Sequence, residues 1–183
     1  MVYSHQLLWA GLIVILLLSP NKIGAQNMAS DIQDRNSVQD QITNLFVYTD
    51  QDQWDKLRAI FAETVLLDYS SFSGQKASEL TSEQIVGAWS GFLPGFRATH
   101  HQVGNFQVQI DGLTAHVFCY GTASHFFPNN SGRNVWVVVG SYDFELEKNN
   151  ETWQVKSMTF YFKYQDGNVD LPKIIENEHK EEK

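Results

Sequence analysis

Residues 115–125 carry the sequence AHVFCYGTASH, and this stretch decides the fold. Alternation along an extended strand puts six of its residues on one face: Ala115, Val117, Cys119, Gly121, Ala123 and His125. Five of these side chains are small or absent, so this face is expected to leave a hollow with His125 at its end. A strand of this kind lines a site more readily than it fills a core.

The period-2 pattern continues on both sides of this stretch. Residues 106–110 alternate between apolar and polar up to a hairpin turn at Asp111-Gly112, and the following strand is expected over 114–126. Two further strands are predicted over 135–147 and 153–164, each bounded by polar turns. The second half of the chain therefore predicts a meander of long antiparallel strands.

Helical spacing dominates the first half. Apolar residues recur at helical intervals over 31–50 and again over 53–61, and a short strand is expected over 65–69. A third helix is predicted to begin after the N-cap residue Thr81 and to end at Pro94-Gly95.

Three N-terminal helices followed by a meander define an α+β fold, with the helices packed on a curved antiparallel sheet that encloses a pocket. We expect one such domain over residues 31–165 and a loose polar tail over 166–183. The pocket is predicted to take a hydrophobic small molecule.

Residues 1–25 have the features of a signal peptide. The apolar run over 7–18 is too short to span a bilayer comfortably, and it is followed by Ser19-Pro20 and by the small residue Ala25. We expect cleavage near Ala25 and an exported protein, periplasmic or secreted, with no membrane association after cleavage. An uncleaved anchor is the alternative, because residues 1–6 contain no Lys or Arg.

Charge and cysteine content exclude several classes of protein. The formal net charge is −8 and no cluster of Lys or Arg is present, which argues against nucleic acid and anionic membranes as partners. Cys119 is the only cysteine, so no intrachain disulfide can form.

Histidines are the candidate catalytic groups. Because His100 and His101 are adjacent in a strand, only one can face the pocket with His125. Strict alternation back from Phe106 selects His100, whereas a bulge at Gly104 selects His101. The residues alone leave both alternatives open.

The sequence predicts no cofactor and no metal. The histidines lack the spacing of zinc motifs, and neither a nucleophile motif nor a Gly-rich phosphate loop is present. An enzyme with this sequence would therefore transfer protons.

Several segments, in order and at similar spacing over residues 38–165, resemble scytalone dehydratase. They are YTDQDQWDKLR at 48–58, LDYSSF at 67–72, EQIVG at 83–87, ATHH at 98–101 and SH at 124–125. The chain therefore resembles the SnoaL-like branch of the NTF2-like superfamily, which implies a cone-shaped α+β fold. Superfamily members include isomerases, dehydratases and non-enzymatic binders.

The resemblance implies four catalytic residues. Asp50 matches the pocket aspartate, Tyr69 a pocket tyrosine that polarises the carbonyl, and His101 the histidine that abstracts a proton. His125 matches the second pocket histidine, acting with Asp50 as the acid or the orienting pair.

Two departures from the family pattern affect substrate binding. The family's second pocket tyrosine falls on Thr49, next to Tyr48, and its polar pair is replaced around residues 140–142. Tyr48 and Tyr142 are the candidate substrate-binding residues.

The leading hypothesis is a dehydratase or isomerase acting on a hydrophobic carbonyl compound. The alternative is a non-catalytic binding or carrier protein of the same fold. Because the fold often pairs through its sheet, a homo-oligomer is a further candidate assembly.

Overall fold

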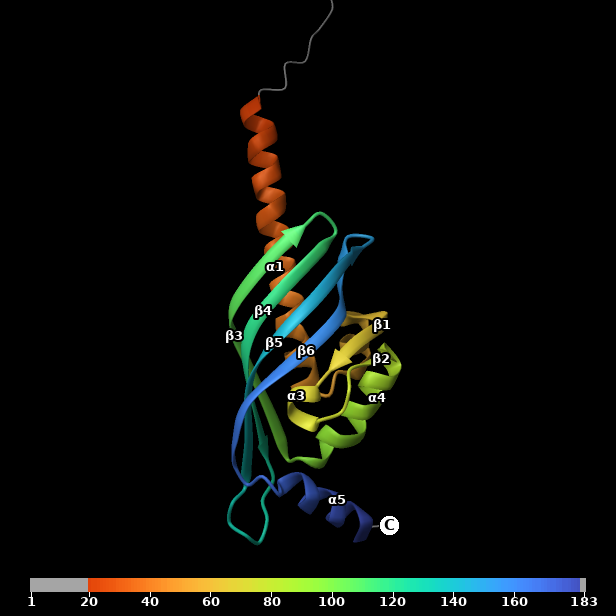
Figure 1. The fold of residues 1–183 in the computed structure, drawn as a ribbon, viewed down its shortest axis with the longest axis vertical. Coiled ribbons are helices and arrows are strands. Elements are labelled where there is room, and N and C mark those ends of the chain that lie inside the picture. The colour runs from red at the N-terminus through yellow and green to blue at the C-terminus, as the bar shows by residue number, and fades with distance from the viewer. Residues whose placement is uncertain (1–19, 182–183) are drawn as a thin grey trace, which may run out of the picture. The chain divides into compact units, whose positions relative to one another are not determined.

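The computed structural model describes residues 20–181, with side chains described for 28–178 (Figure 1). Most of the predicted leader lies outside these residues. Its last six residues begin the helix α1 (Pro20–Asp50), which starts earlier than predicted. The chain divides into two units, residues 1–33 and 34–183, and the second contains the sheet and the site. No helix among the described residues is long and apolar enough to cross a membrane.

Eleven further elements follow α1 in the chain. They are α2 (Trp54–Ile60), β1 (Phe61–Asp68), α3 (Ser70–Ser73), β2 (Ser78–Thr81), α4 (Ser82–Phe92), the 3-10 turn η1 (Leu93–Gly95), β3 (Ala98–Asp111), β4 (Thr114–Phe126), β5 (Val135–Asn149), β6 (Thr152–Gly167) and α5 (Leu171–Glu181).

The predicted α+β fold is confirmed. One curved, unclosed sheet of six strands has the order β2-β1-β6-β5-β4-β3, and the helices pack on it (Figure 1). The long strands β3 to β6 pair antiparallel, as predicted, but β1 pairs with β6 in parallel. This is possible because helices and strands, rather than a hairpin, separate β1 from β6.

A β-bulge in β3 breaks its alternation. The register with β4 shifts between Gly104 and Gln107, and Asn105 lies in the left-handed region at φ 57°. Asparagine tolerates this conformation better than most residues. The bulge changes which residues face the helices, so that His101 turns inward and His100 is exposed. The bulge alternative of the sequence analysis is therefore the correct one.

The core forms where α1 packs against the concave face of the sheet. Val38, Ile42 and Leu45 are fully buried in α1, at the helical spacing that the sequence predicted. Each such side chain contributes about 1.5–3 kcal/mol by leaving water. One turn of α1 before Val38, Asp34 Oδ1 accepts hydrogen bonds from Lys148 Nζ (2.8 Å) and Trp153 Nε1 (3.3 Å). These bonds fix α1 to the β5–β6 hairpin.

The small-residue face of β4 is buried, and aromatic rings fill part of the hollow that the sequence predicted there. The Tyr142 ring from β5 lies over Gly121, where an added Cβ would stand 2.3 Å from the ring. The same ring packs against Phe46 of α1 at a centroid distance of 5.1 Å. Small residues on one strand thus make room for large ones on its neighbours, which the pattern of β4 alone does not show.

The C-terminal segment is not a loose tail in the described residues. α5 buries Leu171 and Ile175, which are one helical turn apart. The buried Asn168 precedes the helix, and its Nδ2 donates to the Arg133 carbonyl oxygen over 2.8 Å. The prediction of a loose tail was wrong because two apolar residues at helical spacing suffice to fix a short polar helix.

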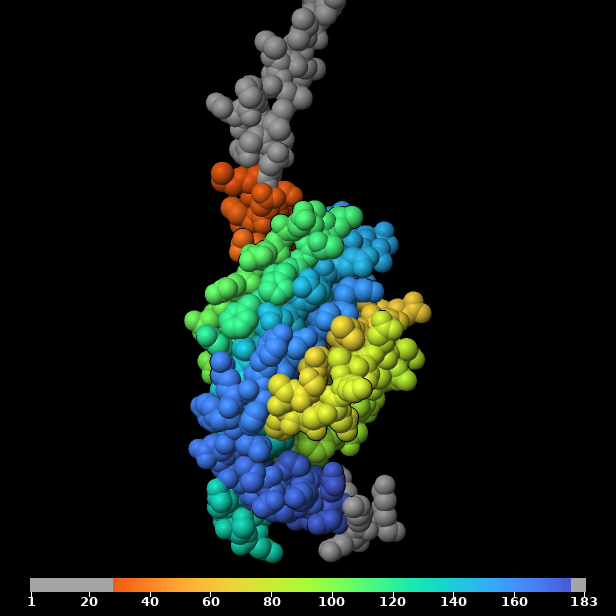
Figure 2. Space-filling view, in the orientation of Figure 1, coloured from red at the N-terminus to blue at the C-terminus, as the bar shows by residue number. Residues whose placement is uncertain are grey.

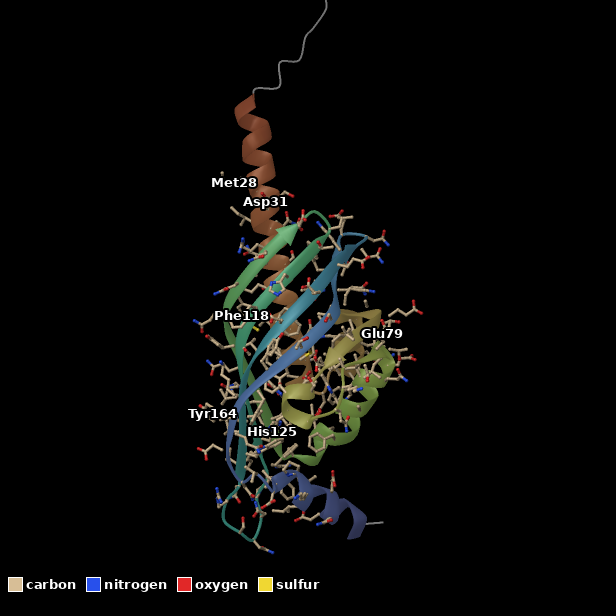
Figure 3. The ribbon with its side chains drawn as sticks, in the orientation of Figure 1. Met28, Asp31, Glu79, Phe118, His125 and Tyr164 are labelled. Atoms are coloured by element: carbon tan, nitrogen blue, oxygen red, sulfur yellow. The ribbon has the colours of Figure 1, made fainter. Side chains whose placement is uncertain are left out.

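The space-filling view shows the layers around the sheet (Figure 2). α3, in yellow, lies against the blue surface of β6, and α5, in dark blue, lies below α4 near η1. β2 lies at the edge of the sheet, on the other side of β1 from β6. The side-chain view places His125 toward the α5 end of the sheet and Phe118 nearer the β3–β4 hairpin (Figure 3).

Candidate active site

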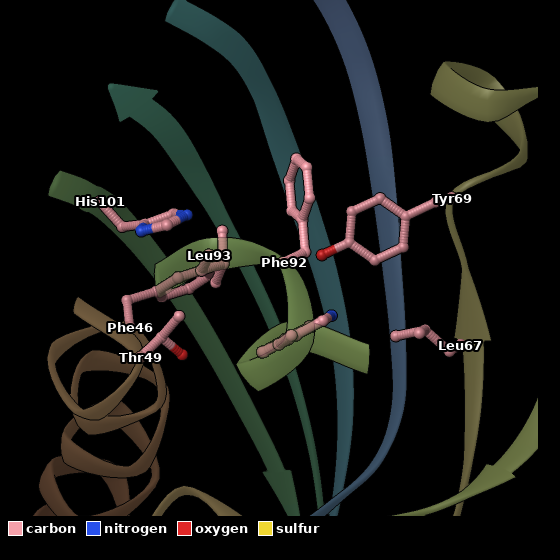
Figure 4. A pocket seen from close by; sticks show the side chains of 8 residues that line it. Phe46, Thr49, Leu67, Tyr69, Phe92, Leu93 and His101 are labelled. Atoms are coloured by element: carbon pink, nitrogen blue, oxygen red, sulfur yellow. The ribbon is translucent and has the colours of Figure 1, made fainter. Parts of the chain in front are cut away.

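A cavity of about 230 Å³ lies between the end of α1, the β1–α3 connection, α4 with η1, and strand β3 (Figure 4). Its lining is mostly apolar and comprises Phe46, Thr49, Leu67, Tyr69, Trp89, Phe92, Leu93 and His101. The Thr49 hydroxyl donates to the Leu45 carbonyl oxygen (2.7 Å) within α1. Among these lining residues, Tyr69, His101 and the indole N–H of Trp89 therefore offer the polar groups available to a ligand.

The helix α4 supplies the aromatic wall, and its start is fixed by a capping box. The Thr81 hydroxyl accepts from the backbone amide of Gln84 (3.2 Å), and the side-chain Oε1 of Gln84 accepts from the backbone amide of Thr81 (2.9 Å). This confirms the predicted N-cap. The helix then places Trp89 and Phe92 against the cavity.

Asp50 and His101 form a dyad at the cavity wall. Asp50 Oδ1 lies 2.6 Å from His101 Nδ1 and accepts from the Thr99 hydroxyl at 2.8 Å, while Oδ2 accepts from the His101 amide at 2.6 Å. Burial opposes ionisation of Asp50, but these hydrogen bonds from His101 and Thr99 outweigh it and lower the pKa of the carboxyl.

The ionised carboxylate determines the tautomer of His101. Because a carboxylate only accepts hydrogen bonds, Nδ1 of His101 carries the proton that it donates to Asp50. In the neutral ring this leaves Nε2 with a free lone pair. His101 lines the cavity with its ring reaching toward it (Figure 4). This is the arrangement of a general base that is oriented by a carboxylate.

Tyr69 lies across the cavity from His101. It follows β1, its ring packs on Phe160 at a centroid distance of 5.5 Å, and its hydroxyl points into the cavity (Figure 4). Burial raises the pKa of Tyr69 well above its ordinary value, so the phenol stays protonated. It can therefore donate a hydrogen bond to a ligand oxygen.

His125 lies next to the dyad and not in the cavity lining. It is 5% exposed and packs against both Phe96 and Trp136, with ring centroids 4.8 Å and 4.6 Å away. Its ring centroid is 5.8 Å from that of His101, and its Nδ1 has no hydrogen-bond partner. Burial, reinforced by the nearby charge of His101, lowers the pKa of His125 to about 4. His125 is therefore neutral at neutral pH.

The pairing predicted between Asp50 and His125 does not form. Asp50 hydrogen-bonds His101 instead, because the bulge turns His101 toward the end of α1. Thr99, the third member of this network, was missed by sequence reasoning. Alternation in the segment 98–101 places Thr99 on the same face as His101 and could have identified it.

The other predicted residues lie outside the cavity lining. Tyr48 is half-buried, with Lys56 Nζ 5.4 Å from its ring centroid, and Tyr142 is buried behind Phe46. His116 faces away from the site, with its Nε2 3.1 Å from Asp143 Oδ1. Within residues 20–181, no group of three or more His, Cys, Asp or Glu side chains is arranged to hold a metal.

Helices packed over the concave face of a curved, unclosed sheet are the arrangement of the NTF2-like fold. The family model of the SnoaL-like domain matches residues 30–159 of this chain, which therefore belongs to the SnoaL-like family. No curated protein matches the sequence.

Solved structures share the fold. A protein from Kribbella flavida is 24% identical with a TM-score of 0.74, and the match covers 78% of this chain and 99% of that one. A putative scytalone dehydratase from Novosphingobium aromaticivorans is 16% identical with a TM-score of 0.63, covering 76% and 90%. The hexachlorocyclohexane dehydrochlorinase LinA-type3 from Novosphingobium barchaimii is 11% identical with a TM-score of 0.62, covering 76% and 92%.

Proposed function

We propose that this protein is a proton-transfer enzyme, a dehydratase or isomerase, which acts on an uncharged hydrophobic carbonyl compound. The observation that carries the proposal is the Asp50–His101 dyad, with Nδ1 and Oδ1 2.6 Å apart, at the wall of an apolar cavity. The names of two solved neighbours, a dehydratase and a dehydrochlorinase, support an elimination.

The residues have complementary roles in such a reaction. Nε2 of His101 takes the proton from the carbon next to the carbonyl group, and Asp50 stabilises the resulting imidazolium. The electron pair moves onto the carbonyl oxygen, which accepts a hydrogen bond from the Tyr69 hydroxyl. In a dehydratase the β-hydroxyl then leaves with the proton from His101 as water. In an isomerase His101 returns the proton to another carbon.

The lining of the cavity favours an uncharged substrate. None of its residues is a lysine or arginine, and the nearby Asp50 is ionised. A carboxylate or phosphate on the substrate would lose its water shell without gaining a counter-ion. The rings of Phe46, Trp89 and Phe92 instead offer contact to an apolar body.

Exchange of deuterium for the α-protons of 2-tetralone in D₂O, followed by NMR, tests proton abstraction without knowledge of the leaving group. We expect the wild-type protein to accelerate exchange above the buffer rate. His101→Ala should reduce the acceleration by about 10²–10⁴-fold, the usual contribution of a positioned base. His100→Ala is the matched control, because His100 is exposed on the other face of β3.

A non-catalytic binding protein is the second candidate. It is favoured by His125, which is neutral and lies outside the cavity lining, and by Thr49, whose hydroxyl is engaged within α1. This candidate predicts that ketones bind without exchange and that the variants change affinity alone. Binding without exchange or turnover across a panel of hydroxy-ketones would refute the enzyme proposal.

A further inference from the structure

The segment after β1 remains attached to β6 although the β-ladder has ended. The last parallel pair between the two strands is Asp68 with Thr159. Beyond it the chain turns into α3, and the Ser71 hydroxyl donates to the Phe160 carbonyl oxygen at 2.5 Å. The oxygen of the Ser71 hydroxyl in turn accepts from the Phe162 backbone amide at 2.9 Å.

These two bonds reproduce those of a strand residue. In a parallel ladder, the N–H and C=O of one residue bond the carbonyl and amide on either side of the opposite residue. Ser71 makes the equivalent bonds on either side of Tyr161 with one oxygen, because a hydroxyl both donates and accepts. A side chain thus extends the ladder past the point where the backbone turns away.

The residue affected by this attachment is Tyr69. Its backbone is no longer extended (φ −115°, ψ 22°), and it has no ladder partner of its own on β6. Before it, the Asp68 carboxylate accepts from the Ser70 amide at 2.7 Å, which fixes the turn. After it, Ser71 bonds the carbonyl of Phe160, the residue on which the Tyr69 ring packs.

We propose that Ser71 is a positioning residue that holds the Tyr69 hydroxyl in the cavity. The catalytic consequence rests on the proposed function, but the placement of Tyr69 does not. Without the Ser71 bonds, the turn has no hydrogen bond to β6 and is held there only by the packing of Phe72 and Tyr69 on its rings. This packing fixes the position of a ring less closely than directional hydrogen bonds do, so the Tyr69 ring shifts toward solvent.

The test is a pH titration of ¹³Cζ-tyrosine-labelled protein by NMR, with the Tyr69 signal assigned from Tyr69→Phe. In the wild type, the chemical shift of this signal should remain that of a protonated phenol at about pH 10, the pH at which exposed tyrosines titrate. In Ser71→Ala it should titrate at distinctly lower pH than in the wild type. Ser71→Thr keeps the hydroxyl and should restore the wild-type titration. Ser71→Cys, a weaker hydrogen-bonding group of similar size, should behave like Ser71→Ala.

Ser73→Ala is the matched control. The Ser73 hydroxyl bonds the Tyr69 carbonyl oxygen (3.1 Å) and the Gln75 amide (3.1 Å), so it acts within the turn and does not reach β6. The Tyr69 titration should stay as in the wild type. An equal change in Ser73→Ala and Ser71→Ala would overturn the proposal, as would a lower melting temperature of Ser71→Ala with an unchanged Tyr69 titration.

Exchange of 2-tetralone separates this inference from the proposed function. If both hold, Ser71→Ala lowers the turnover rate about 10- to 100-fold with little change in KM, because a displaced donor acts mainly in the transition state. If the wild type shows no exchange but Ser71→Ala shifts the Tyr69 titration, the enzyme proposal fails and the positioning role of Ser71 stands.

Discussion

At the scale of single residues, Asp50 organises the site by accepting three hydrogen bonds on one carboxylate. These bonds come from two residues of β3, so the end of α1 and the histidine are fixed to each other. The Asp50 carboxylate therefore both holds the histidine in place and determines its tautomer.

Asp50→Asn should lower the rate of ketone exchange by about 10²-fold or more. An amide at this position can donate to Nδ1 of His101, which transfers the ring proton to Nε2 and removes the base. NMR of ¹⁵N-histidine should show this change of tautomer. Thr99→Val is the control, since it removes a bond to the same carboxylate oxygen and leaves the tautomer unchanged. If Thr99→Val lowers the exchange rate as much as Asp50→Asn does, the position of the His101 ring, and not its tautomer, limits the reaction.

At the scale of elements, strands β4 and β5 fit together through a glycine and a tyrosine. The Tyr142 ring occupies the space over Gly121, and it supports Phe46, which lines the cavity. The small residues of β4 thus make room for large side chains of the neighbouring strand β5. They also affect the cavity, because the Tyr142 ring lies between Gly121 and Phe46.

Gly121→Ala should therefore destabilise the protein by about 1–3 kcal/mol, the cost of overpacking a core. The added methyl would stand 2.3 Å from a Tyr142 ring carbon, so the ring must shift. Gly104→Ala in β3 is the control, because no atom lies within 4 Å of its added Cβ. Urea unfolding measures both. If Gly121→Ala is no less stable than Gly104→Ala, then Tyr142 has room to move. The double variant Gly121→Ala/Tyr142→Leu should lose less than the sum of the single changes.

At the scale of the whole molecule, the buried His125 couples folding to pH. The pKa of His125 is about 4 in the folded protein, below the ordinary value of 6.5 that applies to the unfolded chain. Between these values the unfolded chain binds a proton that the folded protein does not. Stability from this group is therefore complete above pH 6.5 and declines as pH falls toward 4.

The free energy of unfolding should consequently be about 2 kcal/mol lower at pH 5 than at pH 7. Urea unfolding at the two pH values measures the difference. His125→Gln should remove most of this pH dependence, whatever its effect at pH 7, while His100→Gln should retain it. The titratable groups facing His125 are those of the dyad, and the lowered pKa of Asp50 makes its own contribution only at more acidic pH. If the pH dependence persists in His125→Gln, other titratable groups are its cause and this prediction is wrong.

The sequence by itself determined the three main helices, the long strands and the family. Alternation predicted the four long strands within a few residues, and β4 at its observed bounds, because side-chain direction in a strand depends only on local geometry. The Thr81 N-cap was likewise confirmed, since capping involves residues three apart. The resemblance to the SnoaL-like family was confirmed over residues 30–159. Export, cleavage near Ala25 and a homo-oligomer stay predictions.

Only the tertiary structure decided which groups form the site. The choice between His100 and His101 depended on a bulge that periodicity could allow but not establish. The bonding of Asp50 to His101 rather than to His125 depended on a contact between residues 51 apart in sequence. The filling of the β4 hollow and the order of α5 also depended on partners from distant segments. Local patterns determine where a side chain points, but what it meets there is determined by packing across the fold.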